Sequence, residues 1–166
     1  MAAIYSELVN GHVPEMFLAG ALDLDGDGLW VPQAPDVWFR PLILNVTEGY
    51  YVNLLRVRRA GILSRHRHLG PVHAVTLRGT WRYLEHDWTA DAGDYVFEPP
   101  GEIHTLVVPE ACSEMITLFH VTAGYVYLDT DDHITGVEDV FTKIAAVRAH
   151  LKATGMSDEC LAKLLR

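Results

Sequence analysis

The sequence predicts an all-β barrel or sandwich that is followed by a short helical tail. Between residues 37 and 129, several segments are rich in β-branched and aromatic residues, and Gly, Pro and Asp separate them. Short strands at such close spacing are typical of sandwiches and barrels. After residue 137, apolar residues recur at a roughly helical spacing instead. The expected strands are Val37–Val46, Tyr50–Arg58, Ile62–His68, Val72–Glu85, Asp94–Glu98, His104–Val108 and Met115–Asp129.

The two ends of the chain differ from this central part. Residues 1–36 are expected to be irregular, because they hold three prolines and an Asp-Gly-rich run at 23–28. Val137–Thr154 is expected to be a helix that Gly155 ends, since glycine adopts the left-handed conformation of a helix stop. Ser157-Asp158-Glu159 resembles the start of a last short helix through Leu165. These helices are expected to pack outside the barrel or against a second subunit.

Length and composition predict one globular domain. A chain of 166 residues is long enough for a single hydrophobic core and short for two. We therefore expect one domain, with an irregular segment to about residue 36, a barrel over about 37–130 and a helical tail over about 137–166. The 49% hydrophobic and 21% charged residues exclude a disordered or fibrous chain.

Charge and targeting features suggest a cytoplasmic protein. The net charge of −9 argues against a nucleic-acid partner, because such partners select basic surfaces. The first residues lack the basic flank and apolar run of a signal peptide, and no apolar stretch reaches the roughly 18 residues of a membrane span. Cys112 and Cys160 lie far apart in sequence and are expected to be reduced thiols.

Three histidines in two short motifs predict a metal site. His66 and His68 alternate along an expected strand, so both imidazoles lie on the same face. His104 follows the tight turn that Pro99 and Gly101 introduce, and it begins the next strand. Three protein ligands that leave positions open are what a catalytic metal needs, because substrate or oxygen must also bind. The sequence therefore predicts that His66, His68 and His104 hold a metal ion.

The two motifs resemble those of the cupin superfamily. The first contains Gly61, the histidine pair and Gly79, and the second reads G-x5-P-x-G-x2-H from Gly93 to His104. This resemblance covers roughly residues 60–108 and implies a small double-stranded β-barrel with a metal inside. It also implies a homodimer or a higher homo-oligomer, since cupins commonly pair through edge strands that would otherwise stay open.

One position departs from the cupin pattern. Many cupins carry a glutamate five residues after the second histidine of the pair, and His73 stands there in this chain. His73 is either a fourth ligand or a neighbour of a metal that only the other three histidines bind. It shares strand-face parity with Val75 and Leu77, so an inward position is plausible. The alternative is a hydrogen-bond partner of a ligand or an ordinary core histidine.

A wider resemblance points to an activity. The stretches Arg56–His68, Trp81–Trp88, Tyr95–Glu102 and Glu138–Ile144 resemble the 2,4'-dihydroxyacetophenone dioxygenase family. The resemblance implies a non-haem iron(II) enzyme that uses O2 to cleave an aryl hydroxyketone into an aryl acid and formate. It also implies that His66, His68 and His104 are the iron ligands. Imidazole suits several metals, so zinc or nickel could occupy the site in isolated protein.

Two further questions stay open at this level. Glu98 precedes the Pro-Pro turn, where it either orients a metal ligand, accepts a substrate proton, or lies exposed as a capping residue. The activity has three alternatives: a cupin that binds a metal or ligand without turnover, an isomerase on the same barrel, and a dioxygenase that acts on a different diketone.

Overall fold

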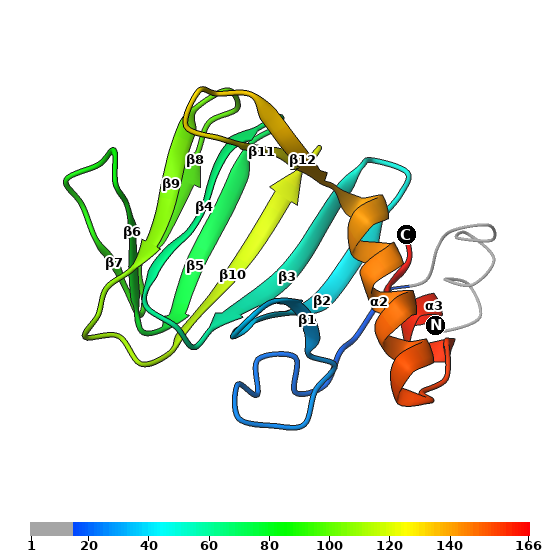
Figure 1. Cartoon of the computed structure of the whole chain (residues 1–166). Helices are drawn as coiled ribbons and strands as arrows, with labels where there is room; N and C mark the ends of the chain where they lie inside the picture. The colour runs from blue at the N-terminus through cyan, green and yellow to red at the C-terminus, as the bar shows by residue number, and fades with distance from the viewer. Residues whose placement is uncertain (1–14) are drawn as a thin grey trace, which may run out of the picture.

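Two six-stranded antiparallel sheets face each other, and two helices pack at one end of them (Figure 1). The computed structural model describes residues 15–166. The first sheet contains, in spatial order, β1 (Val31–Ala34), β2 (Val37–Asn45), β3 (Tyr50–Val57), β10 (Met115–Thr122), β5 (Val72–Arg78) and β8 (Tyr95–Glu98). The second contains β12 (Ile134–Glu138), β11 (Tyr125–Leu128), β4 (Gly61–His68), β9 (Ile103–Val108), β6 (Thr80–Tyr83) and β7 (Ala90–Asp91). The predicted fold class, an all-β barrel with C-terminal helices, is confirmed.

Two of the expected long strands are each divided between the two sheets. The segment expected as Val72–Glu85 breaks at Gly79, which has a φ of 75° and separates β5 from β6. The segment expected as Met115–Asp129 breaks at Ala123 and Gly124, with φ values of 59° and 87°. In both cases the chain passes from the first sheet to the second. A hydrophobic pattern does not show these crossings, because both halves of each segment bury one face.

The segment before residue 37 is more regular than expected. Its first 14 residues lie outside the described part of the chain, but Val31–Ala34 forms β1 and pairs with β2. The prediction is wrong here because Pro32 suggests a break in regular structure, whereas proline is tolerated on an edge strand such as β1. The short strands β7 and β12 were also not expected, and each lies at an edge of the second sheet.

Helix α2 (Val140–Thr154) begins three residues later than predicted, because the preceding residues pair with β11 as β12. Asp139 caps it, in a box that Thr142 completes, and Gly155 ends it with a φ of 69°, as predicted. The second helix, α3 (Glu159–Leu164), was also predicted. Neither helix in residues 15–166 has the length and apolar character that a membrane span requires.

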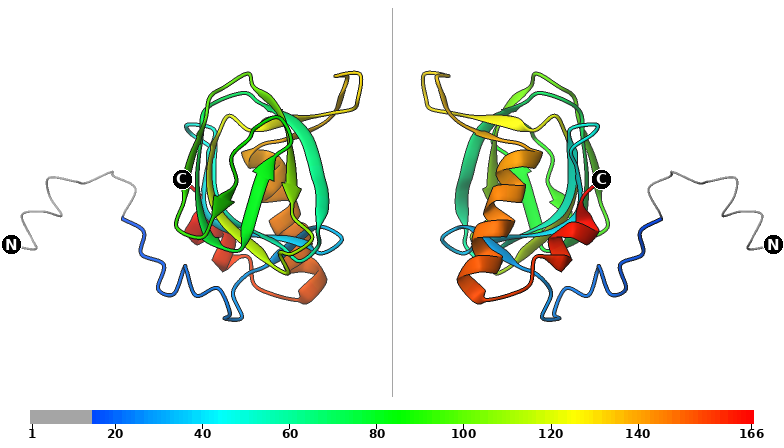
Figure 2. Two further views of the ribbon diagram at one scale, coloured as in Figure 1. Left: turned by 90° about the vertical axis from the view of Figure 1, so that its left-hand side faces the viewer. Right: turned by 90° about the vertical axis from the view of Figure 1, so that its right-hand side faces the viewer.

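Helix α2 packs along β1, β2 and β12 and so covers one side of the barrel (Figure 2). Its buried face consists of Val140, Lys143, Ile144, Val147 and Leu151. Phe141, an apolar residue of the same helix, is exposed. A lysine therefore occupies a place on the buried face that an apolar residue would ordinarily take.

Candidate metal centre

Four buried side chains with metal-binding atoms meet inside the barrel: His66, His68, Glu98 and His104. His66 and His68 lie on β4, and His104 lies directly opposite His66 on the neighbouring strand β9. Glu98 ends β8 in the facing sheet. Each of the four side chains is at most 5% exposed, so the site is enclosed. Both sheets contribute residues to it.

The spacing of the donor atoms fits a single ion. The Nε2 atoms of His66 and His68 are 3.1 Å apart. One carboxylate oxygen of Glu98, Oε2, lies 2.8 Å from His68 Nε2 and 3.6 Å from His104 Nε2. Donors about 2.1 Å from a common ion are separated by about 3.0 Å in octahedral and about 3.4 Å in tetrahedral geometry. The three distances bracket these separations.

The same atoms lack other partners. Within residues 15–166, neither ring nitrogen of His104, nor Nδ1 of His68, nor either oxygen of Glu98 makes a hydrogen bond of good geometry. Buried polar atoms without a partner are rare, because each loses its hydration on folding. A metal ion would satisfy His104 Nε2 and Glu98 at once. The residues present therefore fit a metal, and this buried His/Glu cluster could bind one.

Burial keeps His66 and His104 neutral. Desolvation, together with the nearby His68, lowers the pKa of His66 to about 3. Desolvation and the neighbouring imidazoles His66 and His68 lower the pKa of His104 to about 2. A neutral imidazole offers the lone pair that a metal ligand needs. At neutral pH these rings are therefore in the form that binds metal.

Glu98 has a more direct position than the sequence suggested. Its carboxylate lies among the potential ligands themselves. The local register explains how: Glu98 of β8 pairs with Val72, the first residue of β5. Val72 is fully buried and faces inward, so β5 itself offers no carboxylate at this place. The neighbouring strand supplies the carboxylate instead.

His73 is not among the residues that meet at this site. The inward positions of β5 are Val72, Ala74 and Thr76, which are at most 1% exposed, so His73 lies on the outer face of the sheet. There its Nδ1 lies 2.6 Å from the hydroxyl of Tyr95, and its ring stacks on that of His120. The expected inward position of His73 is wrong, because His73 does share a face with Val75 and Leu77, but this is the outer face of the strand.

Aromatic and hydroxyl groups hold the histidine rings in place. The ring of Tyr83 stacks on His104, with 3.6 Å between centroids and 6° between planes. Ser64 Oγ lies 3.2 Å from Nδ1 of His66. Such contacts to the second nitrogen fix the ring orientation and leave Nε2 for a metal. Tyr125 packs against both His66 and His68, at centroid distances of 4.9 and 5.4 Å.

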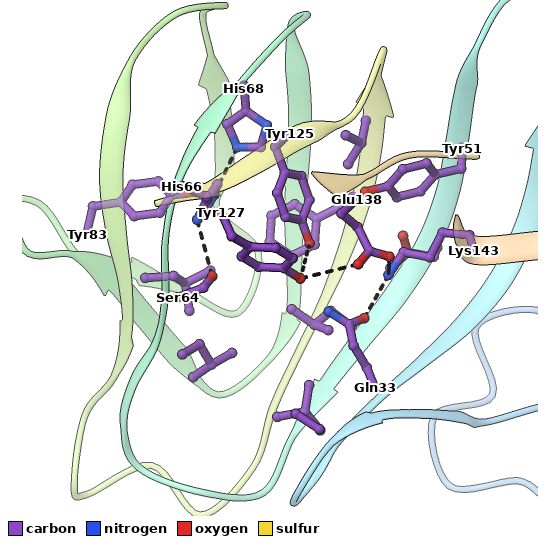
Figure 3. Close-up of a pocket in the computed structure, with 18 of the residues that line it drawn as sticks. Gln33, Tyr51, Ser64, His66, His68, Tyr83, Tyr125, Tyr127, Glu138 and Lys143 are labelled. Carbon is purple, nitrogen blue, oxygen red and sulfur yellow. Dashed lines mark hydrogen bonds and ion pairs between the residues drawn. The ribbon is translucent and has the colours of Figure 1, made fainter. Parts of the chain in front are cut away.

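A cavity of about 430 Å³ lies beside His66 and His68 (Figure 3). One part of its wall is apolar and includes Leu63, Leu106 and Phe119. The opposite part is polar. Its residues are Gln33, Tyr125, Tyr127, Glu138 and Lys143. None of these five was expected from the sequence to line a site. The signal for Lys143 was its place on the apolar face of α2, three residues after Val140 and one before Ile144.

Comparison with known proteins places the chain in a family. Residues 25–126, more than half of the chain, match the ChrR cupin-like domain. The crystal structure of an RmlC-like cupin protein from Ralstonia eutropha JMP134 is 33% identical in sequence, with a TM-score of 0.77. That match covers 86% of this chain and 91% of the other. The chain therefore belongs to the cupin superfamily, in the family of ChrR cupin-like domains. No curated protein sequence matches it.

Two more distant structures share the fold. The acetylacetone dioxygenase from Acinetobacter johnsonii is 17% identical, with a TM-score of 0.71, over 83% of this chain and 94% of the other. The complex of Rhodobacter sphaeroides SigE with the anti-sigma factor ChrR is 19% identical, with a TM-score of 0.50, over 72% and 75%. Structures that share this fold thus include a protein named as a dioxygenase and a protein named as an anti-sigma factor.

Proposed function

We propose that this protein is a non-haem iron(II) dioxygenase that cleaves a carbon–carbon bond of a small chelating ketone. The substrate class is an aryl hydroxyketone of the 2,4'-dihydroxyacetophenone type, which with one O2 gives an aryl acid and formate. The observation that carries the proposal is the convergence of His66, His68, His104 and Glu98, with free donor atoms, beside a cavity.

The proposed residues have distinct roles. His66, His68 and His104 would hold the ion, with Glu98 as a further ligand or as a proton acceptor. Iron(II), when bound, would supply a centre that binds both the chelating oxygens of the substrate and O2. A hydroxyketone loses a proton when it becomes an enolate, and Glu98 Oε1 has no other hydrogen bond within residues 15–166. Glu98 is therefore the group we assign to receive that proton.

The cavity suits such a substrate. Its volume of about 430 Å³ lies within the range of small-molecule sites, and Leu63, Leu106 and Phe119 provide an apolar surface for a ring. The fold shared with an acetylacetone dioxygenase supports O2-dependent cleavage of a ketone on this type of barrel.

Oxygen consumption tests the proposal directly. Protein reconstituted anaerobically with Fe(II) is placed in an oxygen electrode with 2,4'-dihydroxyacetophenone, acetylacetone and other diketones. We expect oxygen uptake with stoichiometric aryl acid and formate from the hydroxyketone, and no uptake by His104→Ala. His133→Ala is the matched control, because His133 is exposed in the loop between β11 and β12 and does not line the cavity. Iron binding without uptake of oxygen on any compound would contradict the proposed reaction.

A second candidate is a cupin that binds a metal without turnover. The match to the ChrR cupin-like domain, and the structure of ChrR bound to a sigma factor, favour it. In that case the purified protein would retain zinc firmly, and iron-loaded protein would consume no oxygen. Metal content by mass spectrometry, measured beside the oxygen assay, separates the two candidates.

A further inference from the structure

A chain of buried polar groups lies at the end of the cavity away from His66 and His68 (Figure 3). Its anchor is Lys143, which α2 directs into the barrel and which is 2% exposed. Lys143 Nζ donates to Glu138 Oε1 at 2.8 Å and to Gln33 Oε1 at 2.7 Å. Nζ also lies 4.1 Å above the ring of Phe39. Its charge and its N–H groups are therefore already occupied.

The chain continues through two tyrosines toward the histidines. Tyr127 donates to Glu138 Oε2 at 3.3 Å, and the hydroxyls of Tyr127 and Tyr125 are 3.3 Å apart. The Tyr125 ring packs against His66 and His68, and its hydroxyl points away from these histidines (Figure 3). A ligand that lies along this ring would reach the histidines with one end and the tyrosine hydroxyls with the other.

The chemistry of the anchor fixes the direction of these hydrogen bonds. Lysine only donates and an ionised carboxylate only accepts. Glu138 therefore accepts from Tyr127, which uses the single proton of the Tyr127 hydroxyl. In the pair of tyrosines, Tyr125 must then donate to Tyr127. The oxygen of Tyr125 keeps lone pairs but has no proton left to offer. The chain of polar groups therefore ends in a hydrogen-bond acceptor on the cavity wall.

Stabilisation of the fold does not by itself account for this chain of buried polar groups. A buried ion pair recovers little of its desolvation cost, and apolar residues of similar volume often replace one without loss. Here the pair lines a cavity and orients two further hydroxyls along it. This arrangement is what a site needs if it recognises one polar group on an otherwise apolar ligand.

We propose that Tyr125 accepts a hydrogen bond from a hydroxyl group at the far end of the substrate, so that the site selects chelating ketones with a hydroxyl donor there. The inference rests on the proposed function for the ketone end of the ligand. An ether oxygen at the same place would face an acceptor and gain nothing. A carboxylate would meet the charge of Glu138, while the lysine that could attract it is already paired.

Matched ligands test the proposal without any turnover. The protein is loaded with Zn(II), which carries out no redox chemistry. Calorimetry then compares 2-hydroxyacetophenone with its derivatives that carry a hydroxyl, a methoxy or a carboxylate group at position 4'. We expect the hydroxyl compound to bind about tenfold more tightly than the other three, the effect of one hydrogen bond between otherwise equal ligands.

Two variants test the assigned direction of the hydrogen bond between Tyr125 and Tyr127. Tyr125→Phe should bring the hydroxyl compound to the affinity of the unsubstituted one and leave the latter unchanged. Tyr127→Phe frees the proton of Tyr125, which can then donate to the methoxy oxygen, so the preference for hydroxyl over methoxy should narrow. Tyr50→Phe is the matched control, because Tyr50 contacts His120 outside the cavity, and it should keep the wild-type order.

The outcomes separate this proposal from the proposed reaction. A hydroxyl preference that Tyr125→Phe removes supports the inference, even where iron-loaded protein consumes no oxygen. Equal affinities for the four compounds, including no measurable binding of any, overturn it, even where the reaction is observed. Preference for the methoxy or carboxylate compound also overturns it.

Discussion

Glu98 places a carboxylate among three imidazoles, and the facing sheet supplies it. A neutral histidine set leaves a divalent ion with its full charge, whereas a carboxylate ligand reduces it and adds a hard oxygen donor. Because both Glu98 oxygens are buried without a hydrogen bond within residues 15–166, the carboxylate is also costly unless a cation or proton joins it. The ion gains a charged oxygen ligand, and the buried carboxylate gains a cation. For both reasons we expect metal binding to depend on Glu98 as well as on the histidines.

Replacing this carboxylate should weaken metal binding. We expect Glu98→Gln to lower the affinity for Zn(II) and Fe(II) by about 10- to 100-fold, as loss of groups that support a metal typically does. Competition with a chromophoric chelator measures the change. Glu110→Gln, on an exposed turn, is the control. Unchanged affinity would show that Glu98 does not contact the ion, and unchanged turnover with iron bound would remove its assignment as proton acceptor.

The low pKa values of the histidines predict an acid-labile metal-free protein. In the unfolded chain a histidine has a pKa near 6.5, whereas His66 and His104 in the folded protein titrate at about 3 and about 2. Below pH 6.5 these histidines therefore bind protons in the unfolded chain but not in the folded one. The free energy of unfolding falls as the pH falls. At pH 5 the expected loss is up to about 2 kcal/mol for each histidine.

Urea unfolding of chelator-treated protein at pH 7 and pH 5 measures this loss. The variant His104→Asn lacks one of the two titrating rings and should lose about half as much over the same interval. A free energy of unfolding that does not change between the two pH values would contradict the assigned neutral state of these rings.

At the scale of elements, the two sheet crossings set the shape of the barrel. Gly124 joins β10 to β11 with a φ of 87°, and a Cβ there would collide with the backbone carbonyl oxygen of Glu138. The same turn therefore positions the start of α2 and the carboxylate that Lys143 contacts. Close backbone approach, and not the turn alone, requires glycine at this place.

Alanine at Gly124 should destabilise the protein more than alanine at an open glycine. Gly93 has a φ of 102°, and no atom lies within 4 Å of the position that a Cβ would take, so Gly93→Ala should cost only about 1–2 kcal/mol of backbone strain. Gly124→Ala adds the collision and should cost about 3 kcal/mol or more. Denaturant unfolding of both variants checks the difference. Equal costs would show that the carbonyl of Glu138 moves freely.

The buried lysine of α2 makes a second prediction at this scale. Lys143→Met leaves Glu138 buried without its cation and should destabilise the protein by about 3–5 kcal/mol. The double variant Lys143→Met/Glu138→Gln removes both charges and should recover most of that loss. Thermal and urea unfolding of the single and double variants measure the coupling. A double variant no more stable than Lys143→Met would show that Lys143 acts through packing on Phe39 alone.

The elements and the site differ in how much of them the sequence could predict. Alternating apolar residues and the Gly and Pro breaks were sufficient for most strands and both helices, because each signal is local. The histidine motifs identified three of the four side chains that meet at the site. The position of His73 was wrong because both faces of this strand carry apolar residues, so its sequence does not show which face points inward. Lys143 and Tyr125 were missed because their partners come from distant segments, which only the packed structure brings together.

For the whole molecule, the site joins the two sheets of the barrel. His66, His68 and His104 belong to the second sheet and Glu98 to the first, so one ion would tie both together. The buried polar chain makes a similar link, since Gln33 belongs to the first sheet while Tyr125 and Tyr127 belong to the second. Binding in the cavity should therefore stabilise the entire fold and not one loop.

Metal should raise the midpoint of thermal unfolding by an amount that grows with the logarithm of its affinity. An ion that binds only the folded state at 100 times its Kd adds about 2.7 kcal/mol, which corresponds to roughly 5–10 °C for a chain of this size. We expect this rise on adding Zn(II) to chelator-treated wild type, and a rise of less than about 2 °C in His104→Ala on the same scale. His133→Ala, which changes an exposed histidine, should behave as wild type. A rise of equal size in His104→Ala would mean that the stabilising ion binds elsewhere, because His104 is one of the four residues that we assign to it.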